Sequence, residues 1–171
     1  YIHADAALCG MTLTFIQGAP RFDFSTGIQS LSISGHKLIG SPVPCGVVLA
    51  LKQNVDRIAR SIEYVGTLDT TITGSRNAIT PLMLWYAIRS HGMEGFGKVV
   101  NECIQRAEYA VDKLNDIGAA AWRNPHAITV VFPKPALTIL EKWQLAVQED
   151  FAHIMVMPHV TREKIDELVA D

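Results

Sequence analysis

The sequence predicts an α/β protein built in two parts, a larger N-terminal part and a small C-terminal α/β lobe. Strand-like segments near both ends of the chain flank a middle section with helical spacing. Apolar residues make up 49% of the 171 residues and charged residues 19%, a balance typical of a globular domain. The formal net charge of −2 argues against a general nucleic-acid binder. No apolar run approaches the roughly 18 residues of a membrane-spanning helix, which argues against a membrane protein.

Three segments of the N-terminal part are typical of strands. Residues 1–7 form a short candidate that ends in small side chains. Within residues 28–34, apolar side chains alternate with serines, which predicts a strand with one apolar face. Residues 46–51 are a continuous apolar run, which predicts a buried strand. Glycine and proline mark loops at 17–20 and 26–27.

Helical spacing follows in the middle of the chain. Residues 54–64 carry an apolar stripe and predict a helix, whereas the Thr- and Gly-rich residues 66–77 predict a surface loop. Pro81 is suited to the first turn of a helix, where its missing N–H costs nothing. We expect one helix over 82–90 and a longer one over 94–115.

The C-terminal part is predicted to be a separate small lobe. Residues 128–132 and 151–157 predict strands, and residues 161–169 predict a final helix with an incomplete capping box. We therefore expect the larger domain to comprise residues 1–117 and the small domain residues 118–171, with the long helix as the hinge.

The chain begins without an initiator Met or a signal-peptide pattern, inside a strand-like segment, so we expect a fragment of a longer protein. Its three cysteines, Cys9, Cys45 and Cys103, are an odd number without a C-x-x-C pair. This pattern favours small buried hydrophobes over a redox or zinc role, and a reducing cytoplasm as the location.

Two short segments carry the residues best suited to chemistry. Asp5 lies near the end of the first predicted strand, and Lys37 comes three residues after the end of the second. Ligands of open α/β sheets bind beyond the carboxyl ends of the strands. An amine and a carboxylate that converge there suit pyridoxal phosphate, since the lysine can form a Schiff base while the carboxylate keeps the pyridine nitrogen protonated.

The neighbours of these two residues fit the same interpretation. Ala7 lies on the same side of its strand as Asp5 and leaves room for a flat ring. Ser34 and His36 flank the lysine with a hydroxyl and an imidazole, which suit a phosphate or the orientation of the aldimine.

Simpler interpretations stay open on spacing alone. Lys37 also fits a surface lysine, Asp5 a turn or helix cap, and His3 and His36 core histidines. A metal site at His3 and Asp5 is disfavoured. Structural or surface roles are favoured for the other histidines, which lack partners at ligand spacing: His91, His126, His153 and His159.

Longer sequence segments extend this pattern beyond single residues. HADAA is followed by SGHK, with 32 residues from Asp5 to Lys37, and this arrangement resembles the group II pyridoxal-phosphate-dependent amino-acid decarboxylases of fold type I. The chain is similar, more closely, to the bacterial histidine decarboxylases of the pyridoxal-phosphate type. This resemblance runs over nearly the whole chain, through YIHADAALCGM, SISGHKLIGSPVPCGVV, EYVGTLDTTITGSRNAITPLMLWYAI, KWQLAVQED and MPHVTREKID.

The resemblance implies a role for each candidate residue. Lys37 would be the Schiff-base lysine, and Asp5 would pair with the pyridine nitrogen. Ala7 would pack on the ring, while Ser34 and His36 would contact the phosphate or the aldimine. The chain would be the C-terminal part of the large domain followed by the small domain of such an enzyme.

A polar loop is the candidate contribution to a neighbouring subunit. The resemblance implies a homodimer or higher homo-oligomer, in which Ser75 and Arg76 would help to close the partner's active site. A solvated loop is an equal alternative, and Ala78 departs from the glycine that follows GSRN in many relatives.

The activity implied is the conversion of histidine to histamine and CO₂ through a pyridoxal phosphate aldimine. Serine decarboxylases share the SGHK and GSRN segments, so conversion of serine to ethanolamine is the alternative. A third possibility is a catalytically inert fragment, because the phosphate loop and the ring-stacking histidine of this family precede the segment present here. We expect an amino acid as substrate, and no metal, nucleic acid or membrane as partner.

Overall fold

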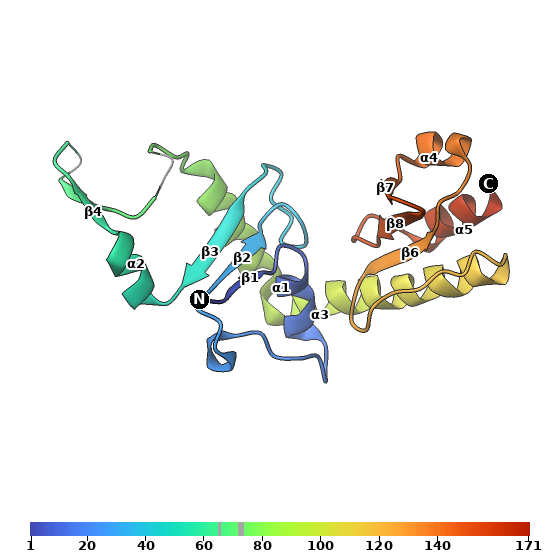
Figure 1. Ribbon diagram of the computed structural model, residues 1–171, viewed down its shortest axis with the longest axis horizontal. Helices are drawn as coiled ribbons and strands as arrows, with labels where there is room; N and C mark the ends of the chain where they lie inside the picture. Colours follow the sequence, from blue (N-terminus) through green and yellow to red (C-terminus); the bar gives the residue numbers. More distant parts are fainter. Residues whose placement is uncertain (65, 72–73) are drawn as a thin grey trace. The chain divides into compact units, whose positions relative to one another are not determined.

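The computed structural model describes residues 1–64, 66–71 and 74–171, which form two compact units (Figure 1). The first unit comprises residues 1–14 and 20–92, and the second comprises residues 15–19 and 93–171. Helix α3 (Ile79–Asp116) belongs to both, and Gly92 interrupts it at φ 59° and ψ −170°. The two predicted helices, 82–90 and 94–115, are thereby confirmed as two helical segments that meet at this glycine.

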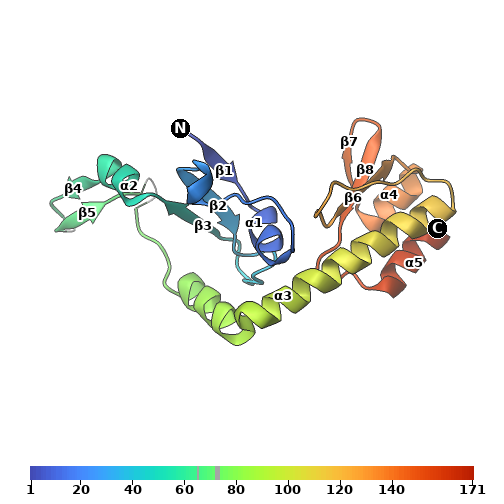
Figure 2. The ribbon, with the colours of Figure 1, turned by 90° about the horizontal axis from the view of Figure 1, so that it is seen from below.

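A three-stranded sheet organises the first unit. Its strands are β1 (His3–Asp5), β2 (Ser30–Ser34) and β3 (Gly46–Ala50), in the order β1-β2-β3 (Figures 1 and 2). β1 and β2 are parallel, with Asp5 opposite Ser32, whereas β3 is antiparallel to β2. All three strands predicted from the N-terminal sequence are confirmed.

The expected burial of the third strand is wrong for this chain. Val48 is 68% exposed and Leu49 is 46% exposed. β3 is an edge strand of the sheet, so one flank lacks a neighbouring strand among the described residues. A continuous apolar run indicates that both faces of a strand can be buried. In the described residues, the side chains of Val48 and Leu49 stay exposed because nothing packs over them.

The two faces of the sheet differ in polarity. Helix α1 (Cys9–Thr12) packs closely on the apolar face, where a Cβ placed on Gly10 would lie 2.8 Å from Ile33. The opposite face carries His3, Asp5 and the even-numbered serines of β2, because side chains alternate along a strand and paired residues share a face. Short 3₁₀ turns, η1 (Leu13–Phe15) and η2 (Phe24–Thr26), lie within the connection from β1 to β2.

The helix predicted over 54–64 is only partly correct. Helix α2 (Lys52–Ile58) ends where Ala59 turns extended, and β4 (Arg60–Ile62) pairs with β5 (Thr67–Asp69) in an antiparallel hairpin. The predicted loop 66–77 is accordingly wrong at β5. Its residues 72 and 73 lie outside the described residues, and residues 74–77 are exposed and irregular.

The start of α3 confirms the role expected of Pro81. This proline is the third residue of the helix and therefore lies in its first turn. Immediately upstream, Asn77 Oδ1 accepts hydrogen bonds from the Thr80 N–H and hydroxyl, both at 2.8 Å. The side chain thus satisfies one of the free N–H groups of the helix end.

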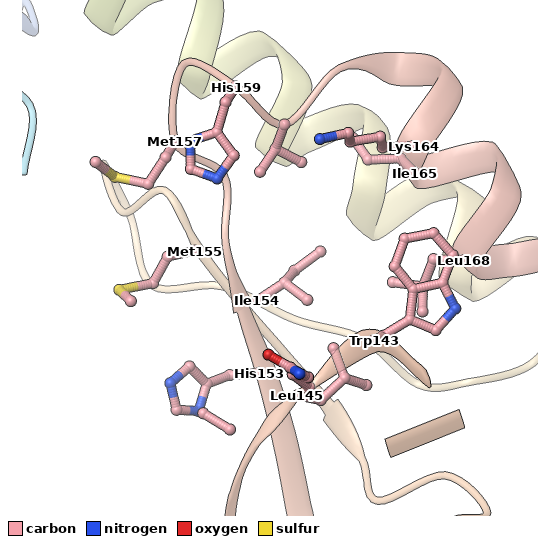
Figure 3. Close-up of a pocket in the computed structure, with 13 residues that line it drawn as sticks. Trp143, Leu145, His153, Ile154, Met155, Met157, His159, Lys164, Ile165 and Leu168 are labelled. Atoms are coloured by element: carbon pink, nitrogen blue, oxygen red, sulfur yellow. The ribbon is translucent and has the colours of Figure 1, made fainter. Parts of the chain in front are cut away.

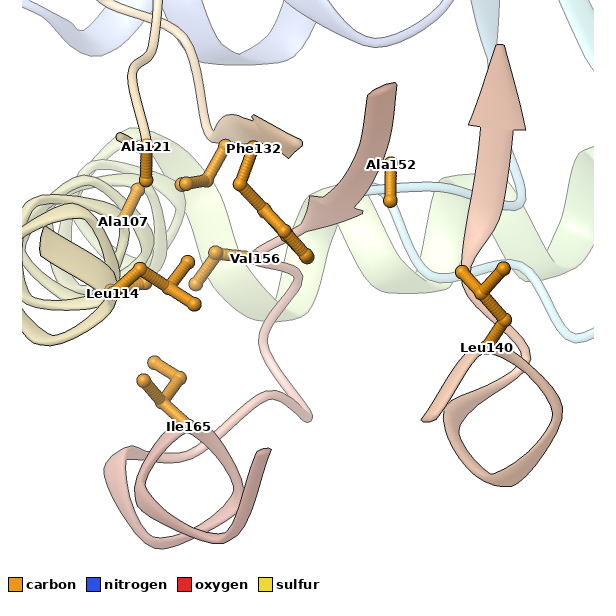
Figure 4. Close-up of a cluster of buried hydrophobic side chains, with 10 residues drawn as sticks. Ala107, Leu114, Ala121, Phe132, Leu140, Ala152, Val156 and Ile165 are labelled. Carbon is orange, nitrogen blue, oxygen red and sulfur yellow. The ribbon is translucent and has the colours of Figure 1, made fainter. Parts of the chain in front are cut away.

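The second unit is a small α/β lobe. Its antiparallel sheet has the order β6-β8-β7, from β6 (Thr129–Pro133), β7 (Ala146–Gln148) and β8 (Phe151–Met155). Helices α4 (Leu137–Trp143) and α5 (Arg162–Ala170) join the second segment of α3 around it. The buried cluster in Figure 4 includes Ala107, Leu114, Phe132, Val156 and Ile165.

The predicted strands at 128–132 and 151–157 and the final helix at 161–169 are confirmed here, whereas α4 and β7 were not predicted. The domain boundary expected after residue 117 concerns the whole protein and stays a prediction. Among the helices of the described residues, none combines the length and apolarity needed to cross a bilayer.

Candidate active site

The first unit brings the two predicted site segments to one edge of its sheet. Asp5 is the last residue of β1, and Ser34 is the last residue of β2. Because these strands are parallel neighbours, their carboxyl ends meet. Beyond the paired residues, the Ser34 N–H donates to the Ala7 carbonyl at 3.1 Å. Backbone hydrogen bonding therefore continues to the point where both segments leave the sheet.

A closed turn fixes the backbone of Lys37. The Gly35 N–H donates to the Cys45 carbonyl at 2.9 Å, and the Ser41 N–H donates to the Gly35 carbonyl at 2.9 Å. Leu38 and Ile39, which follow the lysine, are buried and anchor the turn. Within the part of the chain that the structure describes, no hydrogen bond or ion pair engages the Lys37 ammonium. The amine is thus attached to a fixed backbone without a fixed partner.

His36 is oriented by a backbone contact across the turn. The Cys45 N–H donates to His36 Nδ1 at 3.1 Å. Since a backbone N–H can only donate, we assign the proton of the neutral ring to Nε2. Nδ1 also lies 3.0 Å from the Cys45 carbonyl, a contact that would serve the protonated ring. The exposed ring therefore presents an N–H donor beside Lys37.

The charges of both Asp5 and Lys37 affect the pKa of the Cys9 thiol. Burial raises the pKa of this half-buried thiol, and the hydrogen bond from its own backbone lowers it. The Asp5 carboxylate raises the thiol pKa further, whereas the Lys37 ammonium lowers it. Asp5 and Lys37 thus each contribute a charge to the surroundings of the Cys9 sulfur atom.

The Asp5 carboxylate is exposed and only partly engaged. Its Oδ1 accepts a hydrogen bond from the Ala7 N–H at 3.1 Å. No hydrogen bond to its other oxygen occurs among the described residues, so that oxygen is open to a ligand. Among the described residues, no group of three or more His, Cys, Asp or Glu side chains is arranged to hold a metal ion.

The structure does not bring Ser75 and Arg76 to this site. Both are exposed, and no interaction among the described residues joins either one to Asp5 or Lys37. The positive charge of Arg76 instead affects the pKa of Asp69 in β5. Hydrogen bonds from the Thr71 hydroxyl and backbone lower the pKa of Asp69, and the Arg76 charge lowers it slightly more.

A cavity in the second unit contains none of the predicted site residues. It has a volume of about 440 Å³ and lies between α5, β8 and the chain that follows α4 (Figure 3). Apolar side chains such as Leu145, Ile154 and Leu168 form much of its wall, with His159 and Lys164 at one end. The residues predicted to carry the chemistry, Asp5 and Lys37, belong to the first unit and do not line this cavity.

Sequence reasoning missed two residues near the candidate site. Cys9 was interpreted as a plain core residue, although its place four residues after Asp5 could have indicated its proximity. The Cys45 backbone contacts both Gly35 and His36. The sequence could not indicate these contacts, because every residue type has the same backbone carbonyl and nearly every one the same N–H.

Known proteins resemble the chain along its whole length. It is 49% identical to the histidine decarboxylase of Mesorhizobium japonicum over 169 residues, which is 99% of this chain and 46% of that protein. It is also 49% identical to the histidine decarboxylase of Morganella morganii, over 100% of this chain and 46% of that protein. The chain therefore spans about half the length of the curated relatives that it matches.

The fold is shared with solved decarboxylases. L-methionine decarboxylase from Streptomyces sp. 590 superimposes with a TM-score of 0.86 at 28% identity, over 99% of this chain and 41% of that one. Glutamate decarboxylase from Lactobacillus brevis has a TM-score of 0.81 at 20% identity, over 99% of this chain and 45% of that one, and supports the fold alone. The expected fold class, part of a fold-type I enzyme, is thereby confirmed. The pyridoxal-dependent decarboxylase conserved domain matches residues 1–132, and the chain thus belongs to that family.

Proposed function

We propose that the protein converts L-histidine to histamine and CO₂ with pyridoxal 5′-phosphate as cofactor. Identities of 45–49% to histidine decarboxylases over the whole chain support this substrate. The observation that carries the chemistry is that Asp5 ends β1 while the turn with Lys37 follows the end of β2, the parallel neighbour of β1. Because the chain spans about half of those relatives, the proposal concerns the whole protein.

The groups at the sheet edge fit this cofactor by their chemistry. Lys37 offers the primary amine that would bind the aldehyde, and the open carboxylate oxygen of Asp5 would accept the pyridinium N–H. When bound, pyridoxal phosphate supplies an electron sink for the carbon that loses CO₂. Asp5 would sustain that sink, because a carboxylate favours the protonated, electron-poor ring.

Three further residues would complete this half of the site. His36 can donate its Nε2–H, and Ser34 its hydroxyl, to a phosphate or to the oxygen atom of the cofactor ring. The Ala7 methyl would pack against the ring without filling the space it needs. In each case the side chain orients the cofactor rather than reacting with it.

We also infer a homodimer or higher homo-oligomer in the cytoplasm. Three free cysteines fit a reducing compartment. Exposed apolar residues on the first segment of α3, among them Trp85 at 58% and Tyr86 at 68%, fit an association surface. Ser75 and Arg76 are then the candidate residues for closing the partner's site.

Assays on the full protein test the proposal. With cofactor added, CO₂ release from L-histidine should clearly exceed that from L-serine. Lys37→Ala should abolish both histamine formation and the visible absorbance of the bound cofactor, because its amine is the group proposed to bind the aldehyde. Lys134→Ala, a control in the second unit, should change neither. A preference for serine would overturn the substrate, and a Lys37→Ala protein with both properties intact would remove Lys37 from the reaction.

A further inference from the structure

A hydrogen-bonded histidine lies on the same sheet face as Asp5. His3 Nδ1 is 2.6 Å from the Ser30 hydroxyl, and His3 Nε2 is 3.3 Å from the Ser32 hydroxyl. Both ring nitrogens are therefore engaged by the neighbouring strand. Ser30 is 5% exposed, so the inner end of this arrangement is fixed inside the first unit.

The orientation of the ring follows from the strand register. Ser30 lies opposite His3, and Ser32 lies opposite Asp5. Since Nδ1 contacts the first serine and Nε2 the second, the ring leans along the strand toward Asp5. The ring therefore extends along the sheet face that also carries Asp5, toward the serine that lies opposite Asp5.

Few interactions orient the Asp5 side chain. Apart from the Ala7 N–H at 3.1 Å, no hydrogen bond to its carboxylate occurs among the described residues. An exposed side chain with one such bond samples several rotamers, and orienting it for a ligand costs free energy. A fixed side chain at the preceding position on the same strand face reduces that cost by restricting the available rotamers.

We propose that His3 is a positioning residue for Asp5, held in place by Ser30 and Ser32. It limits the carboxylate to the rotamers that direct its open oxygen beyond the strand end. A serine hydroxyl can donate or accept, so these contacts persist whether the imidazole is neutral or charged. The role is therefore geometric, and it rests on the proposed function of Asp5 as the partner of the cofactor's ring nitrogen.

A double-mutant cycle on the full protein tests this role. The measured quantity is the dissociation constant of pyridoxal phosphate, from an absorbance titration, for wild type, His3→Leu, Asp5→Asn and the double variant. His3→Leu should weaken cofactor binding by about tenfold, as loss of an outer partner does for a metal ligand. In the Asp5→Asn background it should change binding by no more than about twofold.

The controls separate positioning from folding. His3→Gln, which keeps one hydrogen bond, should recover part of the affinity, and Ser32→Ala should lower it only where Asp5 is retained. His159→Gln, in the second unit, should have no effect. If His3→Leu does not fold, as judged by the thermal unfolding of the apo-protein, the Ser32→Ala cycle decides instead.

Two results would overturn the inference. Equal losses in the wild-type and Asp5→Asn backgrounds would show a merely structural role, and unchanged binding in His3→Leu would show no role. A wild-type protein without Lys37-dependent cofactor absorbance would instead overturn the proposed function itself, so the two failures are distinguishable.

Discussion

Gly35 occupies a place in the lysine-bearing turn where a side chain has no room. A Cβ at this position would lie 2.5 Å from Cys45 Sγ and 2.8 Å from Leu84 Cδ2. We predict that Gly35→Ala lowers the free energy of unfolding by about 1–3 kcal/mol, the usual cost of overpacking. Urea denaturation measures this change. Gly46→Ala, which would meet no atom within 4 Å, should stay within about 0.5 kcal/mol of wild type. Equal effects of both substitutions would contradict the prediction.

The same turn shows how far the sequence predicts the site at the level of residues. Asp5 and Lys37 could be placed because one lies near the end of a predicted strand and the other shortly after the next, and parallel strand ends meet. The orientation of His36 could not, because it depends on a backbone N–H nine residues away. The contacts of His3 with two serines likewise need the strand register, which alternation does not fix between strands. The functional roles of these residues stay predictions.

At the scale of elements, a tyrosine links α5 to the second segment of α3. The Tyr109 hydroxyl donates to Asp166 Oδ1 at 2.6 Å, and the Arg162 guanidinium lies 4.8 Å from the ring centroid. The hydrogen bond to Asp166 raises the pKa of Tyr109 above its ordinary value of 10.0, with burial and the carboxylate charge acting in the same direction.

This raised pKa gives a stability contribution with a defined pH range. A tyrosine whose pKa is higher in the folded state stabilises the fold below about pH 10, and the contribution disappears as the pH rises through the folded pKa. We predict that Asp166→Asn returns the pKa of Tyr109 toward its ordinary value. The absorbance of the phenolate at alkaline pH measures it, with Tyr109→Phe subtracted to remove the other tyrosines. An unchanged titration would exclude Asp166 as the cause.

Elements with strong periodicity were predictable, and short or ambiguous ones were not. The second segment of α3 repeats its buried residues over many turns, so its sequence pattern is clear. Ile58 and Ile62 also have helical spacing, yet Ile62 belongs to β4. Two apolar residues four positions apart fit one face of a helix and also one face of a strand. Whether the second residue is helical or extended is then decided by cross-strand pairing. β7 has three residues, all exposed, and α4 lacks a side-chain cap, so neither had a usable signal.

At the scale of the whole molecule, Gly92 is the point where the two compact units meet within α3. Its φ of 59° and ψ of −170° are accessible essentially to glycine alone. We predict that Gly92→Ala destabilises the protein by about 1–3 kcal/mol, measured by urea denaturation.

A second glycine in the same helix provides the matched control for Gly92. Gly97 is helical, and a Cβ there would make an ordinary 3.6 Å contact with Phe15. Gly97→Ala should therefore be neutral or stabilising, by up to about 1 kcal/mol. If Gly92→Ala changed the free energy of unfolding no more than Gly97→Ala does, the prediction that position 92 requires glycine would be wrong.

The parallel pairing of β1 with β2 has a consequence for how such proteins diverge. The connection between these strands passes through exposed turns such as the one at Gly27. An insertion there would increase the number of residues between Asp5 and Lys37 without moving either strand end. A one-residue deletion inside β1 would instead turn the carboxylate to the opposite face of the sheet. Distant homologues should accordingly be recognised by an acid at the end of one strand and a lysine in the turn after its parallel neighbour, whatever the number of residues between them.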